Sequence, residues 1–128
     1  MRLLLDTSVL IDALRLRYRR RELLAELVRA GHTLATSALN VAEVYAGMRP
    51  EETQRTEALL SALECYDLTG TSARRAGSLI QQWARKGRTL TLADMIVAAI
   101  ALEFGCTLMT DNRKDFPMEE LDKFDLPA

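Results

Sequence analysis

Three acidic residues stand alone in apolar stretches, where carboxylates are candidates for metal-assisted chemistry. Each is the only formally charged residue of its stretch: Asp6 in residues 3–11, Glu43 in residues 33–48 and Asp94 in residues 89–102. Burying a carboxylate without a partner costs several kcal/mol. One explanation covers all three. They converge on a divalent cation, which takes hard oxygen ligands and compensates several negative charges at once.

Helix capping is the alternative for each acid taken singly. Thr91 and Asp94 fit the capping-box pattern, and Asn40 and Glu43 fit it less well. Asp6 could be an N-cap residue. Capping explains each position separately, but it does not explain why other charges are absent around all three, so we favour a metal site.

The elements that must position these acids alternate along the chain. We expect strands at residues 3–5, 33–36, 66–68 and 107–110. We expect a helix through residues 9–14 that Thr7 or Ser8 caps, and a second through 23–28 up to Gly31. Further helices are expected at residues 38–48, 51–63, 71–86 and 91–104. This order predicts one α/β domain over residues 1–128, an α/β/α sandwich with a mostly parallel central sheet flanked by helices.

This topology predicts that the acids meet. The carboxyl ends of parallel strands share one edge of a sheet, and the following helices begin there. Asp6 and Asp111 each follow a strand, Asp94 lies in the first turn of its helix, and Glu43 lies about one turn into its own. The fourth contributor remains open among Asp111, Asn112 and Asp115.

The charge balance permits only local contact with nucleic acid. Lys and Arg total 17 against 18 for Asp and Glu, which argues against coating nucleic acid by bulk charge. The densest basic cluster surrounds Tyr18 and could bind an RNA backbone and stack on a base, or form an exposed helix face or a partner surface. The candidate RNA contacts are Arg15, Arg17, Arg19, Arg20 and Arg113.

Other features indicate an intracellular enzyme without a membrane anchor. We expect no export signal and no membrane span, and therefore a cytoplasmic protein. Cys65 and Cys106 are expected to be free, buried thiols. His32, the only histidine, is given no catalytic role.

Four segments in order resemble the motifs of PIN-domain nucleases, specifically the VapC-type toxins of bacterial and archaeal toxin–antitoxin systems. The resemblance runs from residue 2 to about residue 116, and its motifs lie in residues 5–12, 40–47, 92–99 and 110–116. It implies an endoribonuclease dependent on Mg²⁺ or Mn²⁺, a homodimer, and a VapB-type antitoxin whose tail fills the active-site groove. The basic stretch of residues 15–21 departs from the family pattern, which is more often acidic or mixed there.

The resemblance also assigns roles to residues. The catalytic and metal-binding roles fall on Asp6, Glu43 and Asp94, with Asn112 and Asp115 matching the fourth motif. Supporting roles fall on Thr7, Ser8, Thr110 and Asp111. We expect Asp6 and Asp94 to bind the ion directly and Glu43 to act through water, so that a metal-activated water attacks the phosphodiester.

The sequence leaves two alternative functions to consider. One is a catalytically inactive PIN-like module that binds RNA or a partner without cutting, which the full set of acids weakens. The other is a phosphatase or receiver-like domain with an acidic Mg²⁺ pocket. These classes expect a second acid beside or near the first, whereas Thr7 and Ser8 follow Asp6.

Overall fold

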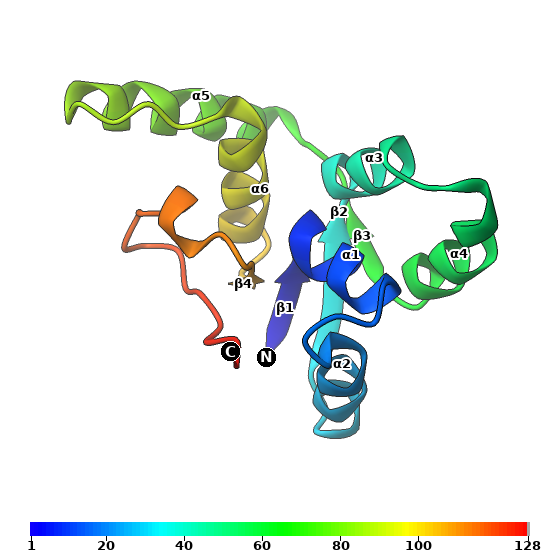
Figure 1. The fold of residues 1–128 in the computed structure, drawn as a ribbon. Helices are drawn as coiled ribbons and strands as arrows, with labels where there is room; N and C mark the ends of the chain where they lie inside the picture. The colour runs from blue at the N-terminus through cyan, green and yellow to red at the C-terminus, as the bar shows by residue number, and fades with distance from the viewer. Residues whose placement is uncertain (128) are drawn as a thin grey trace.

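Four parallel strands form the central sheet, in the spatial order β3-β2-β1-β4 (Figure 1). In the computed structural model, which describes residues 1–127, they are β1 (Arg2–Leu5), β2 (Thr33–Ser37), β3 (Glu64–Tyr66) and β4 (Thr107–Met109). The central strand β1 pairs with both β2 and β4, with Leu4 opposite Ala35 and Leu108. Because all the strands are parallel, their carboxyl ends lie at one edge of the sheet.

Helices cover both faces of this sheet. They are α1 (Thr7–Leu14), α2 (Arg20–Arg29), α3 (Ala38–Ala46), α4 (Thr53–Ser61), α5 (Gly70–Arg85) and α6 (Leu92–Glu103), with the short 3-10 helices η1 (Pro50–Glu52) and η2 (Arg113–Asp115). In Figure 1, α5 and α6 lie on one side of the sheet, and α1, α2 and α4 lie on the other. The expected α/β/α sandwich is confirmed.

The pleat of β1 supplies a core to each face, since successive side chains point to opposite sides of a strand. Leu4 joins the core beneath α5 and α6, whereas Leu3 and Leu5 join the core beneath α1, α2 and α4. All three leucines are fully buried. Burial on both faces fixes β1, and with it the position of Asp6 at its end.

Several expected boundaries were wrong. The third strand is β3, two residues earlier than expected, and it is an exposed edge strand in which Cys65 is exposed rather than buried. The expected helix over residues 51–63 is η1 followed by α4, and α3 ends at Ala46 instead of Met48. Within residues 1–127, none of the helices has the length and apolar character needed to cross a membrane.

Candidate active site

Asp6 lies at the carboxyl end of β1, where its carboxylate is held by two donors. The Nδ2 group of Asn40 donates to Oδ1 at 3.1 Å, and the hydroxyl of Thr110 donates to Oδ2 at 2.8 Å. Asp6 is the N-cap residue of α1 by its backbone, but its side chain makes no capping hydrogen bond. Capping therefore does not explain this acid, which is 6% exposed.

Glu43 reaches the same edge from α3, but it is exposed rather than buried as its apolar stretch predicted. The hydroxyl of Thr7, the first residue of α1, donates to Oε1 of Glu43 at 2.7 Å. Helix α3 is capped by Ser37, whose hydroxyl accepts from the backbone N–H of Asn40 at 3.2 Å. Asn40 is therefore not the cap of α3, and Glu43 belongs to the Asp6 side of the site.

Asp94 completes the acidic cluster from the first turn of α6. Thr91 caps this helix, because its hydroxyl accepts from the backbone N–H of Asp94 at 3.1 Å, and within residues 1–127 no return hydrogen bond from the Asp94 carboxylate to the backbone of Thr91 completes a capping box. Burial raises the pKa of Asp94, the Thr91 hydroxyl lowers it, and the negative charges of Asp115 and Glu43 raise it further.

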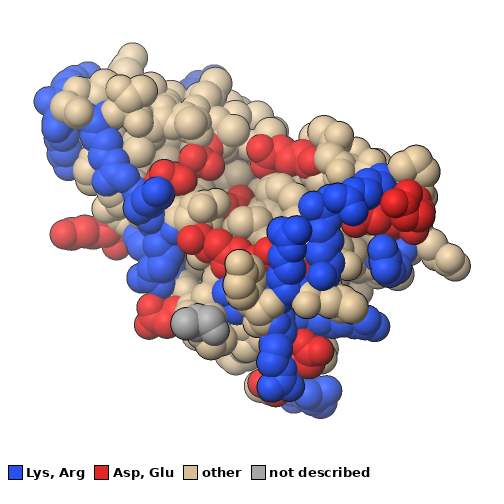
Figure 2. Space-filling model, viewed as in Figure 1, with Lys and Arg blue, Asp and Glu red and all other residues tan. Residues whose placement is uncertain are grey.

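The acids influence one another across the edge of the sheet. Burial raises the pKa of Asp6, the hydrogen bond from Thr110 opposes this rise, and the charges of Asp94 and Glu43 add to it. Among residues 1–127, none of Asp6, Glu43, Asp94 and Asp115 forms an ion pair with Lys or Arg. Figure 2, viewed as in Figure 1, shows acidic side chains gathered in the middle of the visible face, with Lys and Arg on both sides. The structure thus holds uncompensated negative charge in one place.

The acidic residues at this edge suit Mg²⁺ or Mn²⁺ better than an ion that must be enclosed entirely by protein ligands. Every available ligand is an oxygen, as hard cations require. In the described part of the chain, no three acidic, histidine or cysteine side chains stand close enough to chelate one ion by themselves. Mg²⁺ does not need such a cage, because it keeps several waters and binds through one or two carboxylates plus substrate phosphate.

The residues of the loop after β4 differ in how they contact the acidic edge. Thr110 is buried and its hydroxyl also accepts from the backbone N–H of Asn112 at 3.0 Å. The hydroxyl of Ser8 accepts from the backbone N–H of Asp111 at 3.2 Å, so Ser8 holds the loop rather than an acid. Asp115 acts on Asp94 by charge, whereas the side chain of Asn112 is exposed. Of these two residues, only Asp115 adds negative charge near Asp94.

Three of the candidate RNA-binding arginines are engaged elsewhere in the fold. Arg15 pairs with Glu52 at 3.4 Å, and Arg113 pairs with Asp125 at 2.8 Å. Arg20 is 4% exposed and pairs with Asp111 at 3.2 Å, so it is not part of any RNA-facing surface. Arg17, Arg19 and Arg113 remain exposed, because the ion pair of Arg113 with the exposed Asp125 does not bury it.

Asn40 is the functional residue that sequence reasoning missed. It is fully buried and contacts both Asp6 and Thr7 through one amide group, at 3.1 and 3.0 Å. Asn40 is uncharged, so it does not stand out as a lone charge in an apolar stretch. Its position three residues before Glu43, facing the same strand end, was the available signal.

A second acidic contact lies behind the site, where Asp12 meets Asp111. Asp12 is 6% exposed, its Oδ2 has no hydrogen-bond partner among the described residues, and burial followed by the hydrogen bond with Asp111 raises its pKa to about 6. The folded protein therefore binds this proton more tightly than the unfolded chain does. The free energy of unfolding contributed by this group falls as the pH rises from about 4 to about 6.

We therefore expect Asp12→Asn to stabilise the protein above pH 6. The gain is at most about 3 kcal/mol, since each pKa unit is worth about 1.4 kcal/mol, and it should vanish near pH 4, where Asp12 of the wild type is protonated. Urea unfolding at pH 4 and pH 7.5 measures the difference between the two proteins. A gain of equal size at both pH values would contradict the assigned pKa.

The three-layer fold with an acidic strand edge is the arrangement of a PIN-type domain, and a family model for the PIN domain matches residues 3–123. The chain belongs to the PIN domain family. Ribonuclease VapC19 of Mycobacterium tuberculosis is 35% identical over 115 residues, which cover 90% of this chain and 92% of that protein. Ribonuclease VapC10 of the same organism is 34% identical over 118 residues, covering 92% and 88%.

Solved structures agree with this assignment. The chain is similar to one in the crystal structure of VapBC2 from Rickettsia felis bound to a DNA fragment from their promoter, with a TM-score of 0.85, 25% identity, and coverage of 99% of this chain and 100% of that one. A toxin–antitoxin complex from Klebsiella pneumoniae gives a TM-score of 0.78 at 27% identity, with coverage of 97% and 99%.

Proposed function

We propose that this chain is a metal-dependent endoribonuclease that hydrolyses RNA phosphodiester bonds, acting in the cytoplasm as the toxin of a toxin–antitoxin pair. The observation that carries the proposal is the buried carboxylate of Asp6. The charges of Asp94 and Glu43 raise its pKa, and within residues 1–127 no Lys or Arg forms an ion pair with it. The similarity to proteins named ribonuclease VapC supports RNA as the substrate.

The proposed chemistry assigns each acid a task. Asp6 and Asp94 would hold Mg²⁺ or Mn²⁺, Asp115 would add negative charge beside Asp94 and contribute through an ion-bound water, and Glu43 would orient the attacking water. The ion supplies a lower pKa for that water and charge neutralisation at the phosphate. Thr7 and Thr110 keep Glu43 and Asp6 in place by donating hydrogen bonds.

Removing the metal tests this proposal. We expect cleavage of a mixed cellular RNA substrate in Mg²⁺ or Mn²⁺ and none in EDTA, with activity restored when excess Mg²⁺ is added back. The product ends, mapped by sequencing, distinguish internal cuts from trimming. If the protein binds RNA tightly but cuts none in either metal, the inactive-module alternative replaces this proposal.

For RNA contact we propose the loop between α1 and α2. Arg17, Tyr18 and Arg19 are exposed there, and Leu16, Tyr18 and Arg19 have left-handed backbone angles of φ 54–55°. Such angles are costly for residues other than Gly and persist where surrounding contacts enforce them. Arg20 does so by donating to the carbonyls of Tyr18 and Pro127. Because an exposed aromatic ring can stack on an unpaired base, Tyr18→Ala should raise KM for RNA more than it lowers kcat.

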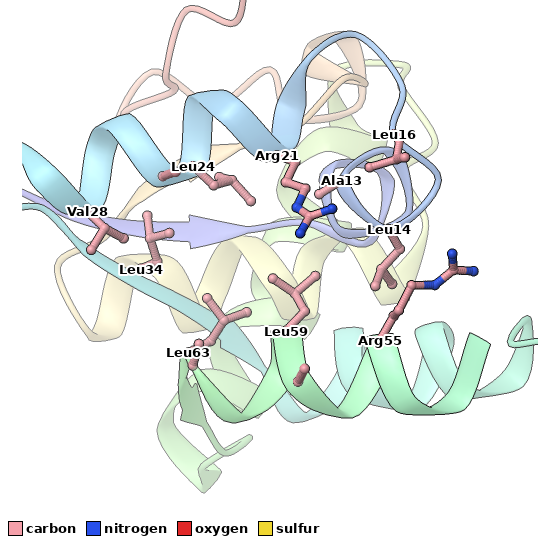
Figure 3. A pocket seen from close by; sticks show the side chains of 13 residues that line it. Ala13, Leu14, Leu16, Arg21, Leu24, Val28, Leu34, Arg55, Leu59 and Leu63 are labelled. Carbon is pink, nitrogen blue, oxygen red and sulfur yellow. The ribbon is translucent and has the colours of Figure 1, made fainter. Parts of the chain in front are cut away.

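For the antitoxin we propose an apolar groove of about 540 Å³ between α2 and α4. Figure 3 shows Leu24 from α2 facing Leu59 and Leu63 from α4 and the segment after it. Arg21 and Arg55 border the groove and no acidic residue lines it, which favours a partner segment with an apolar face and acidic flanks. Ala13 and Leu14 line it at the far end of α1 from Asp6, so this surface is separate from the acidic edge.

We also propose a homodimer, as the family resemblance implies. Tyr45 on α3 and Leu92 at the start of α6 are 39% and 57% exposed, and such apolar side chains suit a subunit interface. Light scattering of the purified chain gives the mass that decides between one copy and two.

A further inference from the structure

We propose that Asn40 is a positioning residue that orients the carboxylates of Asp6 and Glu43 through one directed chain of hydrogen bonds. The inference rests on the proposed function, since it concerns the same acids. It follows from the donors and acceptors around Asn40, whose side chain is fully buried.

The direction of the chain begins at Ser37. Its hydroxyl oxygen accepts from the backbone N–H of Asn40 at 3.2 Å, so its own hydrogen is free to donate elsewhere. That hydrogen goes to Oδ1 of Asn40 at 2.6 Å. Because Oδ1 faces Ser37, the Nδ2 group of the amide must face the opposite way, toward the site.

Nδ2 carries two hydrogens and meets two acceptors. One is Oδ1 of Asp6 at 3.1 Å, and the other is the hydroxyl oxygen of Thr7 at 3.0 Å. Since Thr7 accepts from Asn40, its own hydrogen is directed to Oε1 of Glu43 at 2.7 Å. One amide thus aims donors at both carboxylates, directly at Asp6 and through Thr7 at Glu43.

Thr110 repeats this logic on the other oxygen of Asp6. Its hydroxyl accepts from the backbone N–H of Asn112 at 3.0 Å and donates to Oδ2 of Asp6 at 2.8 Å. With one directed donor on each oxygen, the carboxylate of Asp6 cannot rotate without breaking a hydrogen bond. The two donors thereby fix the orientation of the carboxylate and leave its remaining lone pairs available to an ion. Outer-shell donors have this role at metal sites.

Three substitutions separate the branches of the chain. Asn40→Leu keeps a similar side-chain shape and removes both donors, Thr7→Val removes only the branch to Glu43, and Thr7→Ser retains that branch. Thr36→Val is the matched control, because Thr36 is a buried residue of β2 whose hydroxyl donates to the carbonyl of Leu5 at 3.0 Å, outside the chain. Circular dichroism and thermal melting confirm that each variant folds.

We expect Asn40→Leu to weaken Mn²⁺ binding, measured by electron paramagnetic resonance without RNA, by roughly ten- to hundredfold, and to lower kcat by a similar factor. Thr7→Val should lower kcat while leaving Mn²⁺ affinity within about threefold of wild type, since the donors to Asp6 remain. Thr7→Ser should restore kcat, and Thr36→Val should change neither quantity. If Asn40→Leu binds Mn²⁺ and cleaves RNA as Thr36→Val does, the assignment is overturned.

A measurement without metal or RNA checks the chain itself. In the wild type, both side-chain amide protons of Asn40 should exchange slowly with solvent by nuclear magnetic resonance, and Thr7→Val should release only one of them. Fast exchange of both protons in the wild type would overturn the inference. A wild type that binds Mn²⁺ but cleaves no RNA would reject the proposed function alone, because the Mn²⁺ and exchange results would still decide the role of Asn40.

Discussion

Asp94→Asn is expected to lower RNA cleavage by at least about a hundredfold, because Asp94 is proposed to hold the ion, and losing a direct ligand costs more than the tenfold to hundredfold loss for a supporting contact. The same change is expected to raise the melting temperature of the metal-free protein at pH 7. Burial and the charges of Asp115 and Glu43 raise the pKa of Asp94. Its ionised form therefore destabilises the fold, and a neutral amide removes that cost.

The sign of this effect depends on pH. A carboxyl with a raised pKa in the folded state contributes less stability once the pH passes above that value. The stabilisation by Asp94→Asn should accordingly shrink as the pH falls toward 3.8, the ordinary pKa of Asp. Calorimetry in EDTA at pH 4.5 and pH 7 measures this difference.

Asp67→Asn is a suitable control, since Asp67 is an exposed acid in the segment between β3 and α5. It should change neither cleavage nor the melting temperature by a measurable amount. If Asp94→Asn cleaved RNA as well as this control did, Asp94 would be removed from the site. If it were instead less stable than wild type in EDTA, the repulsion inferred among the acids would be wrong.

Addition of Mg²⁺ should reverse the order of stability. On the proposed function, the wild type should gain stability from an ion that binds only the folded state, and Asp94→Asn should gain less because a proposed ligand is lost. The opposite effects of one substitution on stability and activity are typical of residues placed for function at a cost to the fold.

Asp6 was predictable because burial of charge is unfavourable, but the same reasoning wrongly expected burial of Glu43, which is exposed, and of Asp94, which is half-buried. Asp6, Glu43 and Asp94 stood out by their apolar neighbours, and the strand ends predicted their common edge. In the structure, the charges of Asp94 and Glu43 raise the pKa of Asp6, and the charge of Glu43 raises that of Asp94. Asn40 did not stand out, since a neutral amide has no comparable penalty that a sequence pattern can reveal.

Long-range pairing limited the prediction elsewhere. Arg20 belongs to a run of arginines that indicates an exposed surface, yet it is buried against Asp111, which lies 91 positions away in the chain. The third strand was misplaced because β3 is an edge strand whose Glu64 and Cys65 are exposed, and such strands lack the apolar run of a central strand. In both cases the contact that decides the structure joins residues far apart in the chain: Arg20 with Asp111, and β3 with β2.

Ala58→Asp is expected to weaken binding of the antitoxin partner by at least about thirtyfold, since centrally placed interface contacts are worth about 2 kcal/mol or more. Ala58 is exposed on α4 and lines the apolar groove. A carboxylate there would be desolvated by an apolar partner segment and would repel acidic flanks that Arg21 and Arg55 attract. Calorimetric titration with the protein encoded immediately upstream of this chain's gene measures the loss.

Ser61→Asp provides the matched control, because Ser61 is exposed on the same helix and does not line the groove. Both variants should cleave free RNA at the wild-type rate, since neither touches the acidic edge. Added partner should then inhibit the Ser61→Asp protein as it does the wild type, while the Ala58→Asp protein stays active at the same partner concentration. Equal inhibition of the two variants would place the partner elsewhere, with the active-site groove as the remaining candidate.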